Sequence, residues 1–172
     1  MYNNCFGFTL IEFITVSAII AILVSLGLPA YHRHMAAQEA RTIPHILTIH
    51  IQKAKSEAVM YRHNVIICPS HDTQTCSDDW SNGLIMFLDQ NRNRERDLDE
   101  KILSATQWNT RYGSLHWRGT LQANNLMFKA GTGLPIASNG SFYYCSEKTA
   151  NKKLVLSRMG HIRHEQVNDC SL

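Results

Sequence analysis

The chain has 172 residues, of which 44% are hydrophobic, so it is long enough for one compact domain with a sizeable core. The formal net charge is only +3, which is too small to indicate nucleic-acid binding by itself. Only the distribution of charge along the chain can indicate whether the protein binds nucleic acid. The sequence shows no internal repeat and no low-complexity linker.

The N-terminal region contains a long apolar segment. No residue from Phe13 to Leu28 is charged, and most are Ile, Val, Ala or Leu. Together with Phe8–Ile11 the segment is roughly 20 residues long, about the length that a helix needs to cross a hydrocarbon core. Glu12 stands at the head of this segment, where a charge costs on the order of 2.5–3.5 kcal/mol at mid-bilayer. The carboxylate therefore predicts a partner or a function.

A secretory signal peptide or a plain anchor helix is the alternative reading. Signal peptides have a basic region before an acid-free apolar core, whereas this chain has no Lys or Arg before Arg33. The order Gly7-Phe8-Thr9-Leu10-Ile11-Glu12 instead resembles the prepilin signature of type IV pilins and type II secretion pseudopilins. The resemblance implies that a prepilin peptidase cleaves between Gly7 and Phe8 and that Phe8 is then methylated. It also implies that Glu12 pairs with the amino terminus of a neighbouring subunit, and buried charges are tolerable only when paired. The leader departs from the usual signature because it lacks a basic residue.

The helix is expected to continue beyond the apolar segment, to about Tyr61. Proline removes a backbone donor and clashes with the preceding turn, so a break or bend is predicted near Pro29 and Pro44. Apolar residues then recur every three or four positions, which predicts one buried helical stripe: Ile43, Leu47, Ile51, Ala54 and Ala58. Four charged residues lie off the stripe and are interpreted as a solvated face: Lys53, Lys55, Glu57 and Arg62.

After His63 the pattern becomes strand-like. Short β-branched or aromatic runs predict strands at residues 65–68, 84–88, 115–117, 126–128, 142–145 and 154–156. Turn clusters rich in Asp, Asn, Ser and Gly lie between several of these runs. The sequence therefore predicts an α+β domain in which antiparallel sheets pack on the helix.

The cysteines indicate an oxidising compartment. Cys5 falls in the leader, and the remaining four form an even set: Cys68, Cys76, Cys145 and Cys170. Three pairings are possible, and we favour Cys68–Cys76 with Cys145–Cys170. Four free thiols, or a zinc site formed by Cys68, His71 and Cys76, are the less favoured readings.

Several blocks of the chain resemble the GspH/FimT group of minor pilins. They are Ser56–Ala58, Asn64–Ser70, Thr75–Ser77, Trp80–Asp89 and Leu154–Arg163. The resemblance implies a type IV pilin-like fold and a low-copy filament subunit that is not an enzyme and needs no cofactor. It implies a leader over 1–7, a transmembrane helix over 8–30, its periplasmic half over 31–63 and a β-rich domain over 64–172. The expected location is the inner membrane, with the β-rich domain in the periplasm, and then the filament. Expected partners are other pilins or pseudopilins, the prepilin peptidase and the inner membrane.

The C-terminal tail concentrates positive charge. It contains Lys148, Lys152, Lys153, Arg158, His161, Arg163 and His164. In the FimT branch, which binds DNA in natural transformation, the similar segment reads Gly-Arg-x-Arg with a further Arg before the Gly. Arg158 and Arg163 match that pattern, whereas His161 replaces the first motif arginine. The resemblance predicts non-specific contact with double-stranded DNA by Arg158, Arg163, His161, Lys152 and Lys153. The alternatives are a solvated basic hairpin and a purely structural subunit that initiates filament assembly by binding other minor pilins.

One loop has the spacing of a calcium site. Asp89, Asn91, Asn93, Glu95, Asp97 and Glu100 fall at positions 1, 3, 5, 7, 9 and 12 of an EF-hand loop. Position 6 is Arg94 instead of the usual Gly, and Arg92 and Arg96 add positive charge. We therefore interpret the segment as a charged hairpin tip and predict no metal site. No nucleophile elbow, phosphate loop or paired-carboxylate motif indicates catalysis.

Overall fold

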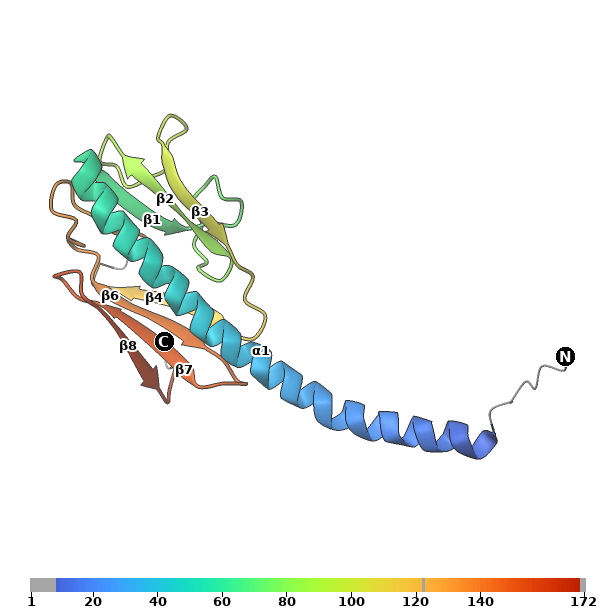
Figure 1. Cartoon of the computed structure of the whole chain (residues 1–172). Coiled ribbons are helices and arrows are strands. Elements are labelled where there is room, and N and C mark those ends of the chain that lie inside the picture. The colour runs from blue at the N-terminus through green and yellow to red at the C-terminus, as the bar shows by residue number, and fades with distance from the viewer. Residues whose placement is uncertain (1–8, 122, 171–172) are drawn as a thin grey trace, which may run out of the picture.

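The computed structural model describes residues 9–121 and 123–170. Within them, helix α1 (Leu10–Tyr61) precedes two four-stranded antiparallel sheets. Figure 1 shows the C-terminal half of α1 lying across both sheets, while its N-terminal half projects away from them. The predicted α+β, pilin-like architecture is confirmed.

Sheet A has the strand order β3-β2-β1-β5 and sheet B the order β4-β6-β7-β8. Sheet A consists of β1 (Asn64–Pro69), β2 (Gly83–Asp89), β3 (Ile102–Gln107) and β5 (Leu126–Phe128). Sheet B consists of β4 (Ser114–Gly119), β6 (Gly140–Cys145), β7 (Asn151–Leu156) and β8 (Ile162–Val167). The registers pair Ile66 with Phe87 in sheet A and Leu154 with His164 in sheet B.

All six predicted strands are present, but the sequence interpretation missed β3 and β8. Both are edge strands, and each is buried on one side at most. Edge strands commonly carry charged and polar side chains that discourage further pairing, so their apolar signal is weak. In β8 this is evident at Arg163, His164 and Glu165.

Of the predicted break or bend in the helix, the structure shows no break and one bend. Helix α1 runs without interruption through Pro29 and Pro44. Figure 1 shows one bend, between the half that packs on the sheets and the projecting half, and the packed half runs straight. A bend relieves the clash of a proline ring, so the remaining intrahelical hydrogen bonds survive. The Thr9 side chain caps the start, accepting a hydrogen bond from the Glu12 N–H at 3.3 Å.

The predicted apolar stripe forms the centre of the core. Its five residues are all buried, and they belong to one cluster with residues of both sheets. Trp80 and Phe142 meet edge to face in this cluster, with ring centroids 4.8 Å apart. A second, smaller cluster of Ile66, Cys68, Ile85 and Phe87 lies apart from it. Since these residues alternate with those facing the helix, the smaller cluster covers the outer face of sheet A.

Two of the four charged residues expected on a solvated face have structural contacts instead. Lys53 Nζ donates to the Leu103 carbonyl at 3.2 Å, and Lys55 Nζ donates to the Gly160 carbonyl at 2.8 Å. Both lysines are half-buried. Gly160 has φ +73°, and a Cβ there would lie 2.9 Å from Lys55 Nζ, so this glycine permits the contact. The lysines thus attach α1 to the start of β3 and to the turn before β8.

Glu39 of α1 provides a third polar attachment. Its carboxylate accepts hydrogen bonds from the N–H groups of Arg111 and Tyr112 at 3.0 and 3.2 Å. It also accepts one from the Tyr144 hydroxyl, in β6, at 2.7 Å. Burial, together with this bond, raises the pKa of Tyr144 above its usual range. Glu39 therefore holds the β3–β4 connection and sheet B against the helix.

Both favoured disulfides are present. Cys68–Cys76 closes a short loop after β1, and Cys145–Cys170 ties the C-terminal tail to β6. Within the short loop, backbone N–H groups of Thr75 and Gln74 donate to the Asp72 carboxylate and lower its pKa well below the usual range.

We expect Leu47→Ala to lower the free energy of unfolding by about 2–5 kcal/mol, because it opens a cavity where α1 meets both sheets. Denaturant unfolding of the full chain in detergent, followed by tryptophan fluorescence, measures this. The matched control is Ile49→Ala in the same helix; Ile49 is 48% exposed, so a change within about 0.5 kcal/mol is expected. Equal losses in the two variants would contradict the assigned stripe.

Stability should also fall at high pH. In the unfolded chain, Tyr144 loses its proton at about pH 10. The raised pKa keeps Tyr144 protonated in the folded state at the same pH, so unfolding becomes more favourable as the pH rises above about 10. Thermal unfolding from pH 8 to 11 should therefore show a shallower decline in Tyr144→Phe than in the wild type. Tyr143→Phe, which removes a neighbouring phenol without the Glu39 bond, should keep the wild-type slope. A wild-type slope in Tyr144→Phe would refute the coupling.

Candidate functional site

The projecting half of α1 is an unpartnered apolar surface. This half contains a stretch that is long and apolar enough to cross a membrane, and no residue of that stretch is buried. Phe13 is 67% exposed and Leu26 is 70% exposed. Because such side chains stabilise a protein only when removed from water, this surface requires lipid or other helices around it.

Glu12 lies in the first turn of α1, between exposed Ile11 and Phe13. The salt bridges formed among the described residues do not include it. The predicted cleavage and methylation residues, Gly7 and Phe8, lie outside the described residues. The arrangement presents one carboxylate at the exposed end of an apolar helix, where a cation from another chain can reach it.

The cations of the C-terminal tail lie on one hairpin but do not form a single patch. Arg158 and His161 are exposed in the turn between β7 and β8. Lys153 pairs with Glu165, and Arg163 with Val155, on the face of sheet B turned away from the core. Lys152 pairs with Gln166 on the opposite face, next to α1. The cations of the predicted basic tail therefore lie in the turn and on both faces of the hairpin.

Glu165 offsets part of this charge. Its carboxylate lies 3.7 Å from Lys153 Nζ and 3.7 Å from Arg163 Nη2. Lys153 Nζ also lies 5.5 Å from the centre of the Tyr143 ring. The Arg163 side chain is 72% exposed, so its ion pair is open to water and weak. Two of the five predicted DNA-contacting residues thus share one acid.

A cavity beside the hairpin was missed by the sequence analysis. It has a volume of about 260 Å³ and lies between α1 and the strands β7 and β8. Arg41 and His45 of the helix line it, together with Lys152, Lys153, His164 and the acid Glu165 of the hairpin. Thr48 Oγ1 lies 3.1 Å from His164 Nε2 and joins the two elements there. Arg41 and His45 are one helical turn apart, which is the signal that could have indicated them.

The turn itself is held by local hydrogen bonds. Ser157 N–H donates to the His161 carbonyl at 2.9 Å, and Ser157 Oγ accepts from the His161 N–H at 3.0 Å. Arg158 borders a cavity of about 290 Å³ that Leu121, Pro135 and Ile136 also line. Together with the Lys55–Gly160 contact, these bonds fix how the turn presents Arg158 and His161 to solvent.

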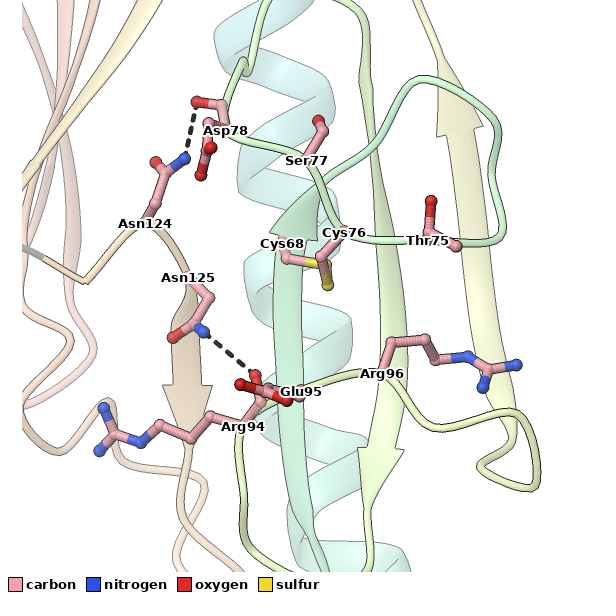
Figure 2. A pocket seen from close by; sticks show the side chains of 10 residues that line it. All are labelled: Cys68, Thr75, Cys76, Ser77, Asp78, Arg94, Glu95, Arg96, Asn124 and Asn125. Carbon is pink, nitrogen blue, oxygen red and sulfur yellow. Dashed lines mark hydrogen bonds between the residues drawn. A yellow bond between two sulfur atoms is a disulfide. The ribbon is translucent and has the colours of Figure 1, made fainter.

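Another cavity, of about 380 Å³, separates the Cys68–Cys76 loop from residues 94–96. Figure 2 shows Arg94 and Arg96 pointing to opposite sides of their loop. The zinc reading is wrong because Cys68 and Cys76 are bonded to each other. Over residues 9–121 and 123–170, no three His, Cys, Asp or Glu side chains are gathered as metal ligands.

The fold is similar to that of known minor pilins. The Pseudomonas aeruginosa type IV minor pilin FimU matches with a TM-score of 0.57 and 20% identity, over 78% of this chain and 96% of that chain. The minor pseudopilin EpsH from the type 2 secretion system of Vibrio cholerae matches with a TM-score of 0.52 and 10% identity, over 76% of this chain and 99% of that chain. No curated protein matches.

Two family models match the sequence directly. The prokaryotic N-terminal methylation motif matches residues 2–28, which include the predicted prepilin signature. The model of the type II transport protein GspH matches residues 47–160, more than half of the chain. These are families of structural subunits and not of enzymes. The chain therefore belongs to the GspH family, and it is a minor pilin or pseudopilin of a type IV pilus or a type II secretion system.

Proposed function

We propose that α1 first anchors the chain in the bacterial inner membrane, with the two sheets in the periplasm, and then enters the helical core of a filament. Cleavage between Gly7 and Phe8, followed by methylation of Phe8, precedes assembly. The observation that carries this proposal is the fully exposed apolar half of α1 with Glu12 at its head. Lipid and a bundle of like helices are two environments that cover such a surface on all sides.

Glu12 directs the transfer from membrane to filament in this proposal. A carboxylate inside an apolar bundle is strongly unfavourable alone, and removing one partner of a buried pair costs about 3–5 kcal/mol. The amino group that cleavage creates on Phe8 of a neighbouring subunit is a suitable partner. The ion pair therefore favours the position in the filament at which the Glu12 carboxylate meets the Phe8 amino group of the neighbouring subunit.

Glu12→Gln should reduce incorporation into filaments by at least about tenfold, because the amide keeps the shape but not the charge. The measurement is the ratio of this subunit in sheared filaments to that in membranes, by immunoblot. Glu12→Asp, which keeps the charge on a shorter side chain, should retain more incorporation than Glu12→Gln. Mass spectrometry of the mature chain checks that Phe8 is the methylated terminus in every variant. Normal incorporation of Glu12→Gln would refute the pairing role.

We further propose that the β7–β8 hairpin binds double-stranded DNA without sequence preference, as in the FimT-like reading. The support is the exposure of Arg158, His161 and Arg163 on one hairpin, beside the cavity that Arg41 and His45 line together with Glu165. Lysine and arginine side chains bind phosphate oxygens without reading bases, and the affinity falls steeply with salt. His161 lacks the permanent charge and the forked set of donors that an arginine would supply at this position, so binding is weaker.

A purely structural role is the second candidate. The observation that favours it is the ion pairing of Lys153 and Arg163 with Glu165, which lowers the charge available to DNA. In this case the subunit initiates assembly of a pilus or pseudopilus by binding other minor pilins.

DNA binding predicts opposite effects for two substitutions on the hairpin. In gel-shift assays of the full chain in detergent at low salt, Arg158→Gln and Arg163→Gln should each weaken binding several-fold. Glu165→Gln should strengthen it, because Lys153 and Arg163 lose their internal partner. Arg92→Gln, an equal charge change on the loop after sheet A strand β2, should have little effect. Absence of a shift at low salt, with retained binding to other minor pilins, would refute the DNA role and support the structural one.

A further inference from the structure

Asp89, the last residue of β2, is an unusual buried acid. It is 1% exposed, and both of its carboxylate oxygens are buried without a hydrogen-bond partner. A carboxylate without a hydrogen bond or a counter-charge is among the most unfavourable groups that a protein can bury. The position therefore indicates a missing cationic partner.

The strand pattern shows where the Asp89 side chain points. Leu84, Met86 and Leu88 face the main core, whereas Ile85 and Phe87 belong to the cluster on the outer face of sheet A. Because side chains alternate along a strand, Asp89 continues the outer face. Figure 2 shows residues 94–96 of the β2–β3 loop (residues 90–101) crossing the strand that carries Cys68, on this face.

Contacts of the loop support that placement. Residues 94–96 line a cavity together with Cys68 of β1. The Asn125 side-chain amide donates to the Arg94 carbonyl at 3.2 Å, as the dashed line in Figure 2 shows. The outer face of sheet A, to which strand alternation assigns Asp89, is thus the face that residues 94–96 cover.

Several other oxygen-bearing residues of the loop are joined to one another by hydrogen bonds. Glu100 is 4% exposed, and its two carboxylate oxygens accept hydrogen bonds from the N–H groups of Gln90 at 2.8 Å and Asp97 at 3.2 Å. The side-chain amides of Asn91 and Asn93 lie 2.8 and 2.9 Å from the same oxygen of Asp97. Oxygen donors at positions 1, 3, 5, 9 and 12 of a loop, with the carbonyl at position 7, are the ligand set of EF-hand calcium sites.

The missing glycine does not prevent the turn that such a loop needs. Arg94, at position 6, has φ 65°, and Arg92 has φ 66°, so both adopt the left-handed conformation. Arg94 and Arg96 point to opposite sides of the loop in Figure 2, so their charges do not meet at one point. The missing glycine is therefore compatible with the turn that a metal-binding loop needs.

We propose that the segment Asp89–Glu100 binds one hard divalent cation of the calcium class. The ligands are the side chains of Asp89, Asn91, Asn93, Asp97 and Glu100 with the carbonyl of Glu95. The three carboxylates are not gathered into one cluster among the described residues, so binding closes the loop onto Asp89. Flexible oxygen coordination of this kind suits Ca²⁺ better than Mg²⁺, which demands near-ideal octahedral geometry.

Arg96 is the competing partner for Asp89. Its Nε and Nη1 atoms are also buried without a hydrogen-bond partner. The ion pairs among the described residues do not join the two side chains. In the absence of metal, the effect of Asp89→Asn on the unfolding temperature distinguishes the two partners. Loss of an Asp89–Arg96 pair would lower this temperature, whereas an empty cation site predicts no decrease.

The experiment uses the full chain in detergent, stripped with a chelator and titrated with Ca²⁺ by calorimetry, with Mg²⁺ as a second titrant. We expect one Ca²⁺ per chain, with a dissociation constant on the order of 10⁻⁴–10⁻³ M, as in extracellular modules, and weaker binding of Mg²⁺. Asp89→Asn and Glu100→Gln should each weaken Ca²⁺ binding by at least about tenfold. Asp99→Asn, an exposed acid of the same loop at a position that supplies no ligand, should bind as the wild type.

Thermal unfolding provides a second measurement. Ca²⁺ should raise the unfolding temperature of the wild type and of Asp99→Asn, but not that of Asp89→Asn. Without Ca²⁺, Asp89→Asn should unfold at the same or a higher temperature, because a buried charge without a partner has been removed. No binding at millimolar Ca²⁺ to a folded wild-type chain would overturn the proposal, and so would undiminished binding by both ligand variants. A lower unfolding temperature of Asp89→Asn without Ca²⁺ would assign Asp89 to Arg96 instead.

Discussion

One continuous helix has to satisfy two different environments, and the rest of the structure depends on this constraint. Its first half is apolar on all sides and exposed, so it requires surroundings that the chain itself does not provide. Its second half has a single buried stripe, which the two sheets cover. Because α1 passes without a break from one half to the other, the sheets are mechanically joined to whatever surrounds the apolar half.

Three polar contacts add orientation to the packing of that stripe. Glu39 attaches sheet B, Lys53 attaches the start of β3, and Lys55 attaches the turn before β8. Hydrophobic burial is non-directional, whereas each of these bonds joins one helix position to one backbone or hydroxyl group. The hairpin that carries Arg158 and His161 is therefore held at a defined place relative to the helix axis. A surface for DNA or for a neighbouring subunit is useful in a filament only if it is positioned in this way.

Much of the fold was predictable because local patterns and burial agree. The stripe from Ile43 to Ala58 and the six apolar strands follow from periodicity. The cysteine count predicts two disulfides, and the favoured one of three possible pairings is present. The edge strands β3 and β8 were missed, since an edge strand is only half-buried and carries polar side chains. Lys53 and Lys55 were assigned to solvent because a sequence does not show which carbonyls the fold brings near. The sequence likewise does not show that the cations of the tail, which are neighbours in sequence, lie on different faces of a hairpin.

The strand register explains why the number of cations in the tail is a poor guide to its function. Alternation sends Lys152 toward α1 and Lys153 away from it, and it places Glu165 opposite Lys153. The outward face thus combines two cations with one acid. The cavity beside α1 gains Arg41 and His45 from a helix far away in the sequence, but Lys153 and Glu165 line it as well.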